Sequence, residues 1–191
     1  MQFVKNNISI QKRMTGFTLL ESLISLSIFA AFASIAISSY HDMILNQRLE
    51  SAATQIYNDL SVAKSEAIKQ NKKIHVSFSQ QNHGWCYGIN EEKQCDCNKA
   101  NDCRLNAIET VFKGDEFKGI MLQKARFAGG GSSTVFDPRK GFAIGKGVKN
   151  GSIWLKAEND SQMAVIINRL GRIRFCSKDL DRYSKQCPKL P

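Results

Sequence analysis

The fold is decided by residues 16–40, which read GFTLLESLISLSIFAAFASIAISSY. Between Phe17 and Ile37 this segment has one charged residue, Glu21. A helix rises about 1.5 Å per residue, so a segment of this length can cross the ~30 Å hydrocarbon layer of a bilayer. We therefore predict a transmembrane helix over residues 17–40.

A short basic leader, residues 1–16, precedes this segment and ends in QKRMTG. In an ordinary secretory signal the cleavage site follows the apolar run, whereas here the basic residues lead directly into Gly16 and that run. Cleavage between Gly16 and Phe17 would leave the apolar segment as the N-terminus of the mature chain. Glu21 would then need a partner, because an isolated carboxylate in lipid is costly. The α-amino group of Phe17, from the same subunit or from a neighbour, is the nearest candidate.

The hexapeptide G-F-T-L-L-E at 16–21, with its basic leader and apolar helix, resembles the class III signal of type IV pilins and pseudopilins. The resemblance implies cleavage by a prepilin peptidase after Gly16, N-methylation of Phe17, and assembly in which Glu21 meets the Phe17 amine of an adjacent subunit. It also implies a single-pass protein of the bacterial inner membrane with a periplasmic domain, which later joins major and minor pilins in a pilus at the cell surface. A plain signal anchor, in which the glutamate has no role, is the alternative.

Basic residues are concentrated near the C-terminus. The formal net charge of the chain is +10, and the segment Lys146–Pro191 holds ten basic but four acidic residues. A positively charged region of this kind attracts polyanions, so a polyanionic partner of this chain would bind there. A solvated basic surface without a partner is the alternative.

Six cysteines, an even number, lie downstream of the export signal. Disulfides are the default in an exported domain, because it meets an oxidising compartment. Four of the cysteines could imitate a zinc site, but their C-x-C-x5-C spacing lacks the paired C-x2-C knuckles of such sites. We predict no metal or other cofactor. Cys176 and Cys187 are predicted to form a disulfide, and the sequence leaves open the pairing of Cys86, Cys95, Cys97 and Cys103.

Past Tyr40 the helical pattern continues to residue 71. Apolar residues recur every three to five positions, and no glycine or proline interrupts the segment from Phe17 to Asn71. We expect one long helix whose second part, residues 41–71, is amphipathic and packs one face on a globular domain. The apolar positions of that face are Ile44, Leu49, Ala52, Ile56, Leu60, Ala63 and Ala67.

The period of the pattern then changes to two. Residues 74–78 alternate between apolar and polar, a turn follows at Asn82–Gly84, and residues 85–89 alternate again, which predicts a hairpin. Further strands are predicted at Ile108–Phe112, Ile120–Phe127, Thr134–Phe136, Ser152–Lys156, Met163–Asn168 and Arg172–Cys176. The predicted fold is α+β, with the long N-terminal helix packed on an antiparallel β-sheet domain over residues 72–191.

Three segments of the C-terminal half resemble the globular domain of the FimT/GspH family of minor pilins and pseudopilins. They are STVFDPRKGFA at 133–143, SIWL at 152–155 and AVIINRLGRIRF at 164–175. The resemblance implies a type IV pilin-like fold, and the cysteine-rich loop Asn90–Leu105 is the least family-like part. Members similar to FimT carry a G-R-x-R motif associated with DNA binding during uptake, and residues 171–174, GRIR, match it position by position.

The residues of this motif lead to the same hypothesis. In a strand, Arg172 and Arg174 would point to one face about 6–7 Å apart, while Ile173 and Phe175 would point to the other. Guanidinium groups bind phosphate oxygens bidentately and stay charged, and Gly171 permits a turn that would lift the pair to the edge of the domain. Further charge is expected from Arg169, Lys178, Arg182 and Lys185. An ordinary exposed strand, whose arginines pair with Asp179 and Asp181, is the alternative.

The expected function is therefore that of a minor type IV pilin that binds extracellular DNA for natural transformation. Because no recognition helix or zinc finger is visible, binding should be dominated by phosphate contacts and largely independent of sequence. The alternative is a structural or priming minor pilin, or a type II secretion minor pseudopilin, that touches only other pilins. An enzyme is not expected, since the three histidines are scattered and no hydrolase, metalloprotease or P-loop motif occurs.

Overall fold

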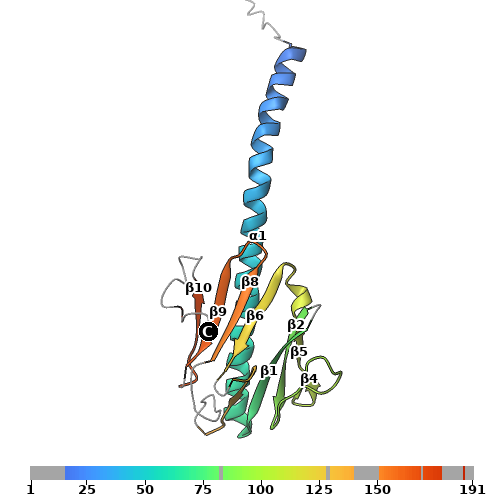
Figure 1. Ribbon diagram of the computed structural model, residues 1–191. Coiled ribbons are helices and arrows are strands. Elements are labelled where there is room, and N and C mark those ends of the chain that lie inside the picture. Colours follow the sequence, from blue (N-terminus) through green and yellow to red (C-terminus); the bar gives the residue numbers. More distant parts are fainter. Residues whose placement is uncertain are drawn as a thin grey trace, which may run out of the picture. The chain divides into compact units, whose positions relative to one another are not determined.

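The computed structural model of the chain describes residues 16–81, 84–127, 130–139, 151–168, 170–177 and 187, without the side chains of residues 35–39. The chain divides into two compact units, Met1–Tyr40 and His41–Pro191. One helix, α1 (Leu19–Gln70), begins in the first unit and ends in the second (Figure 1).

In the first unit, α1 begins with a capped turn. The Glu21 amide donates a hydrogen bond of 3.2 Å to the side-chain hydroxyl of Thr18, which satisfies one of the backbone donors left over at a helix start. The Glu21 side chain is exposed, and a negative charge in the first turn is favoured by the helix dipole. Large apolar side chains between Phe17 and Phe32 are exposed as well.

The membrane span predicted for residues 17–40 is not supported. Among the residues that the structure describes, no helix is long and apolar enough to cross a membrane.

In the second unit, α1 buries one face in the core. The predicted positions from Leu49 to Ala67 are all buried, whereas Ile44 is half-buried and its neighbour Leu45 is the buried residue. The helix ends where the sequence predicts. Asn71 has a φ of 53° and the Lys72 amide bonds back to the Ala67 carbonyl at 3.3 Å, a left-handed turn that commonly terminates helices.

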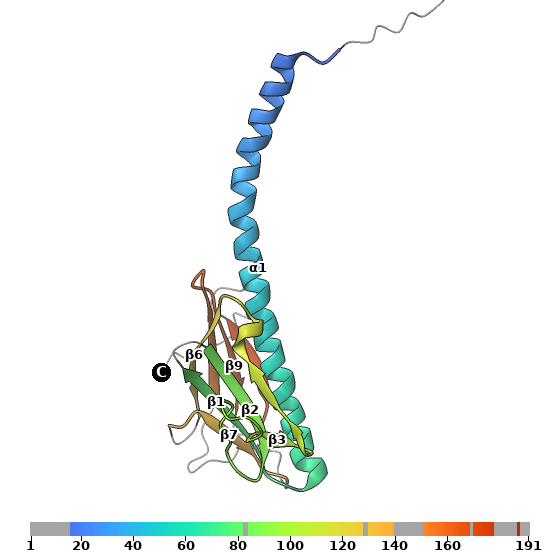
Figure 2. The same ribbon diagram turned by 90° about the vertical axis from the view of Figure 1, so that its right-hand side faces the viewer.

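Antiparallel sheets form the rest of the second unit. Among the described strands, one sheet has the order β5-β2-β1-β7, a second has the order β10-β9-β8-β6, and β3 and β4 form a short pair (Figures 1 and 2). The strand bounds are β1 Ile74–Gln81, β2 Gly84–Glu91, β3 Arg104–Leu105, β4 Ile108–Glu109, β5 Val111–Lys113, β6 Ile120–Arg126, β7 Ser133–Phe136, β8 Gly151–Ala157, β9 Gln162–Ile167 and β10 Ile173–Ser177. The predicted fold class and the predicted hairpin, β1 with β2, are confirmed.

The bounds of all six further strands differ from the prediction, four of them by only one residue at one or both ends, and the other two differences have a structural cause. The segment Ile108–Phe112 is divided between β4 and β5, because the Thr110 amide bonds to the Cys103 carbonyl (3.0 Å) while the Thr110 carbonyl accepts from Ile89 (3.0 Å). The last strand begins at Ile173 rather than at Arg172. The short strand β3, within the cysteine-rich loop, is absent from the prediction.

The main hydrophobic core of the described residues joins α1 to both four-stranded sheets. A polar contact also links the helix to the first sheet, since the Tyr87 hydroxyl of β2 donates a hydrogen bond to the Asp59 carboxylate of α1. Burial raises the pKa of Asp59 and that of Tyr87, because both charged forms lose hydration. The neutral tyrosine therefore remains the hydrogen-bond donor, and this contact helps to hold the helix on β2.

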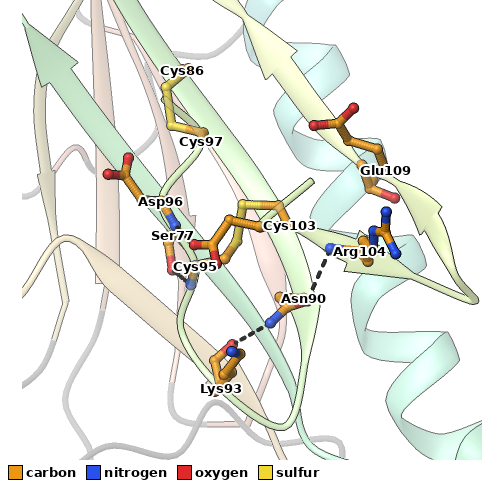
Figure 3. Close-up of a disulfide and its surroundings, with 12 residues drawn as sticks. Ser77, Cys86, Asn90, Lys93, Cys95, Asp96, Cys97, Cys103, Arg104 and Glu109 are labelled. Carbon is orange, nitrogen blue, oxygen red and sulfur yellow. Dashed lines mark hydrogen bonds between the residues drawn. A yellow bond between two sulfur atoms is a disulfide. The ribbon is translucent and has the colours of Figure 1, made fainter. Parts of the chain in front are cut away.

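All six cysteines are paired in disulfides. The bonds are Cys86–Cys97, Cys95–Cys103 and Cys176–Cys187, so the predicted C-terminal disulfide is confirmed and no thiolate is left for the zinc site that the spacing imitates. The first two bonds alternate along the chain (Figure 3). Cys86–Cys97 joins the loop after β2 to that strand, and Cys95–Cys103 closes the loop on itself.

Two residues of β2 fit this loop closely. A Cβ atom on Gly88 would lie 2.2 Å from the Cys103 sulfur, so this position requires glycine as long as the Cys95–Cys103 bond is present. The buried side chain of Asn90 accepts a hydrogen bond from the Arg104 amide (2.9 Å) and donates one to the Lys93 carbonyl (3.2 Å), as Figure 3 shows. The loop is thus fixed by covalent bonds, close packing and satisfied polar groups.

Candidate nucleic-acid interface

The candidate site begins with the turn that joins β9 to β10. The Asn168 side-chain oxygen accepts hydrogen bonds from the amides of Leu170 and Arg172, both at 2.9 Å. The backbone of Asn168 adds two more, since its carbonyl accepts from Gly171 and its amide donates to the Arg172 carbonyl, each at 3.0 Å. Gly171 has a φ of 67°, a conformation that glycine adopts at little cost. The predicted turn at Gly171 is confirmed.

Helix α1 also contacts the Asn168–Gly171 turn. The Lys64 ammonium group of α1 donates a hydrogen bond to the Gly171 carbonyl at 3.1 Å, although the two residues are 107 positions apart in the sequence. Gly171 is buried and Lys64 is half-buried. Because the turn is held both by the Asn168 side chain and by the helix, the backbone on either side of Arg172 is well positioned.

The side chains after the turn alternate as the sequence predicts. Arg172 and Arg174 are exposed, whereas Ile173 and Phe175 are half-buried and pack against the core. The Phe175 ring lies 4.9 Å, centroid to centroid, from the Tyr57 ring of α1. The apolar side of the segment is therefore anchored on the helix, and the two guanidinium groups are on the solvent side.

The position of Arg172 differs in one respect from the prediction. Arg172 precedes β10 instead of belonging to it. The reason is that its amide donates a hydrogen bond to the Asn168 side chain and not to a neighbouring strand. Arg174 lies within β10, opposite Ile166 of β9. Since β10 comes last in the order of its sheet among the described strands, the pair is at a sheet edge.

The other predicted contacts cannot be placed in this site. Arg169, Lys178, Arg182 and Lys185 all lie outside the described residues, as do the acidic residues of the alternative hypothesis, Asp179 and Asp181. Conversely, sequence reasoning missed Asn168 and Lys64. The Asn168–Gly171 spacing is a turn signal that could have revealed the first of these, but no local signal connects Lys64 with the motif.

At the other end of the chain, the predicted processing site is accessible. Gly16 and Phe17 precede α1, both are exposed, and Glu21 is in the first helical turn. This arrangement leaves the Gly16–Phe17 peptide bond outside regular secondary structure.

Both units are similar to known protein families. The family described as Type II transport protein GspH matches residues 52–171, and the Prokaryotic N-terminal methylation motif matches residues 11–37. The GspH match stops at Gly171, so Arg172 and Arg174 lie just beyond it. No curated protein matches the chain in sequence.

The chain is also similar to solved structures of a minor pilin and of a minor pseudopilin. The type IV minor pilin FimU of Pseudomonas aeruginosa is 18% identical with a TM-score of 0.47, and the match covers 68% of this chain and 88% of that one. The minor pseudopilin EpsH from the Type 2 Secretion System of Vibrio cholerae is 12% identical with a TM-score of 0.48, covering 70% of this chain and 99% of that one.

Proposed function

Since the chain belongs to the GspH family of type II transport proteins, we propose that it is a minor type IV pilin that binds extracellular DNA and serves DNA uptake in natural transformation. The observation that carries the proposal is the presentation of Arg172 and Arg174 on the solvent side of a sheet edge, beside a turn fixed by Asn168 and Lys64. Forked guanidinium donors on a rigid support suit the phosphate backbone of a nucleic acid.

The proposed binding does not depend on DNA sequence. The two arginines lie at a sheet edge and not on a helix, and the one α-helix of the described residues, α1, buries a face of its second half in the core. Phosphate contacts from arginines position a protein on DNA without reading bases. A receptor for DNA of any origin needs this kind of contact.

The first unit serves assembly in this proposal. The prepilin peptidase cleaves after Gly16, Phe17 is methylated, and Glu21 pairs with the Phe17 amine of an adjacent subunit. The match to the N-terminal methylation motif and the exposed Gly16–Phe17 bond support these steps. The partners are then the other major and minor pilins, with the second unit in the periplasm before assembly and on the pilus surface afterwards. The role is binding and assembly, and we propose no catalytic one.

A second candidate function is that of a structural subunit without affinity for DNA. The family description, which refers to type II transport, favours this candidate. Such a subunit could be a priming minor pilin or a minor pseudopilin of a secretion system. The two functions differ in whether the exposed arginines meet phosphates or another pilin.

Processing gives a direct prediction. Intact-mass analysis of the protein from cells that assemble pili should show loss of residues 1–16 and the addition of one methyl group. The reason is that the motif places the scissile bond before the apolar helix, in an exposed segment. A chain that retains its leader in such cells would rule out assembly as a pilin.

DNA binding by the full chain, kept in solution with a mild detergent, tests the proposed function. Anisotropy titrations should give similar affinities for labelled DNA of unrelated sequences and equal length, because phosphates and not bases are contacted. The logarithm of the affinity should fall linearly with the logarithm of the salt concentration. If the chain has no measurable affinity for DNA even at low salt, the structural subunit becomes the better description.

A further inference from the structure

Another exposed arginine, Arg126, lies at the opposite edge of the sheet that carries Arg174. It is the last residue of β6, and β6 and β10 are the two outermost described strands of this sheet (Figure 1). Nothing in the local sequence of β6 connects this residue with the G-R-x-R motif. The connection comes from the register of the strands.

The register puts Arg126 and Arg174 in one row across the sheet. Arg174 is opposite Ile166, Ile166 is opposite Ser152, and Ser152 is opposite Arg126. Residues directly opposite each other in antiparallel strands project to the same face of the sheet. The two arginines therefore belong to the same face, at the end of the sheet where the Asn168–Gly171 turn lies.

The distance between the two edges follows from sheet geometry. Neighbouring strands are ~4.8 Å apart, so the three spacings from β10 to β6 separate the backbones of Arg174 and Arg126 by about 14 Å. The major groove of B-DNA is about 12 Å wide, with a phosphate backbone on each side. Two long cationic side chains at this separation are better placed to contact the phosphate backbones of two DNA strands, one each, than to contact the same backbone together.

The middle of the face is not available for such contacts. Ile166, between the two arginines, is 4% exposed, and in the next row Trp154, Ala164 and Cys176 are fully buried. Cys187, bonded to Cys176, packs against this cluster. Arg126 and Arg174 are therefore the exposed residues of this row.

We propose that Arg126 is a second phosphate contact and that this face of the sheet binds double-stranded DNA, with one strand at the β10 edge and the other at the β6 edge. The proposal rests on the proposed function, because it assigns the form of DNA that the same surface takes. It assigns a role to a residue that precedes the basic C-terminal region and lies outside the G-R-x-R motif.

The test compares Arg126→Gln with Arg172→Gln in the full chain, on duplex and on single-stranded DNA of the same length. The matched control is Arg104→Gln, an exposed arginine in β3 and therefore outside this sheet. Arg126→Gln should weaken duplex binding about fivefold to tenfold, the loss of one charge-assisted contact, and reduce the salt slope by about 0.9. Its effect on single strands should be smaller, and the control should bind as the parent does.

The results of this experiment distinguish a failure of the second phosphate contact from a failure of the proposed function. If Arg172→Gln weakens binding and Arg126→Gln does not, the second edge is not used and this inference is overturned while the proposed function stands. An equal loss on duplex and on single strands for Arg126→Gln would overturn the claim of duplex binding. If neither variant changes the affinity, the proposed function itself fails. Arg126→Lys keeps the charge, so this variant should retain most of the duplex affinity. A large loss of duplex affinity in Arg126→Lys would also contradict the proposal.

Discussion

Replacing Arg172 and Arg174 together by glutamine is expected to weaken DNA binding about 100-fold. Each arginine contributes a charge-assisted contact of about 1.5 kcal/mol, which corresponds to about tenfold in affinity. Both side chains are exposed, and the residues that anchor the segment, Ile173 and Phe175, are unchanged. The fold should therefore survive the double substitution. Cells that carry it should assemble pili but transform poorly.

The matched control for this experiment is the double variant Arg104→Gln, Arg139→Gln. It removes the same charge from two exposed positions that lie outside the β10-β9-β8-β6 sheet. Both variants should keep the melting temperature of the parent, so that a difference in DNA binding reports the site and not the overall charge. Equal transformation by the two variants would mean that Arg172 and Arg174 have no special role in uptake.

Replacing Cys95 and Cys103 together by serine is expected to lower the free energy of unfolding by about 2.5 kcal/mol. The residues are separated by eight positions, and the loss reflects the entropy that the open loop regains in the unfolded chain. For a protein of this size, the melting temperature should fall by about 5–10 °C, which differential scanning calorimetry would measure. An unchanged melting temperature would show that this disulfide does not stabilise the fold.

The same variant separates stability from function. The Cys95–Cys103 bond lies beside β2, in the sheet that does not carry the arginines. At a temperature where the variant is folded, its affinity for DNA should equal that of the parent. A large loss of affinity would mean that the cysteine-rich loop takes part in binding.

Local patterns in the sequence predicted the elements that depend on local interactions. The end of α1 at Gln70 followed from the change of period and from Asn71, which adopts the left-handed turn. The alternation around Arg172 and Arg174 was also predictable, because a strand with one buried face has a period of two. The Cys176–Cys187 disulfide was predictable because these cysteines stand apart from the other four.

Features that depend on distant contacts were not predictable. Four cysteines allow three pairings, and their loop-closure entropies differ little, so the spacing of Cys86, Cys95, Cys97 and Cys103 does not select among them. The start of β10 after Arg172 depends on the Asn168 side chain, which competes with a strand partner for the Arg172 amide. The contact of Lys64 with Gly171 arises only when α1 packs against the sheet.

The central claim is that Arg172 and Arg174 contact DNA phosphates, and the salt dependence of binding tests it most directly. The affinity of the full chain for one duplex should be measured over a range of salt concentrations, for the parent and for the double glutamine variant. Each phosphate contact contributes about 0.9 to the slope of log affinity against log salt, so the two slopes should differ by about 1.8. Equal slopes, in variants of equal melting temperature, would contradict the claim, because they would show that neither arginine displaces counterions from the DNA.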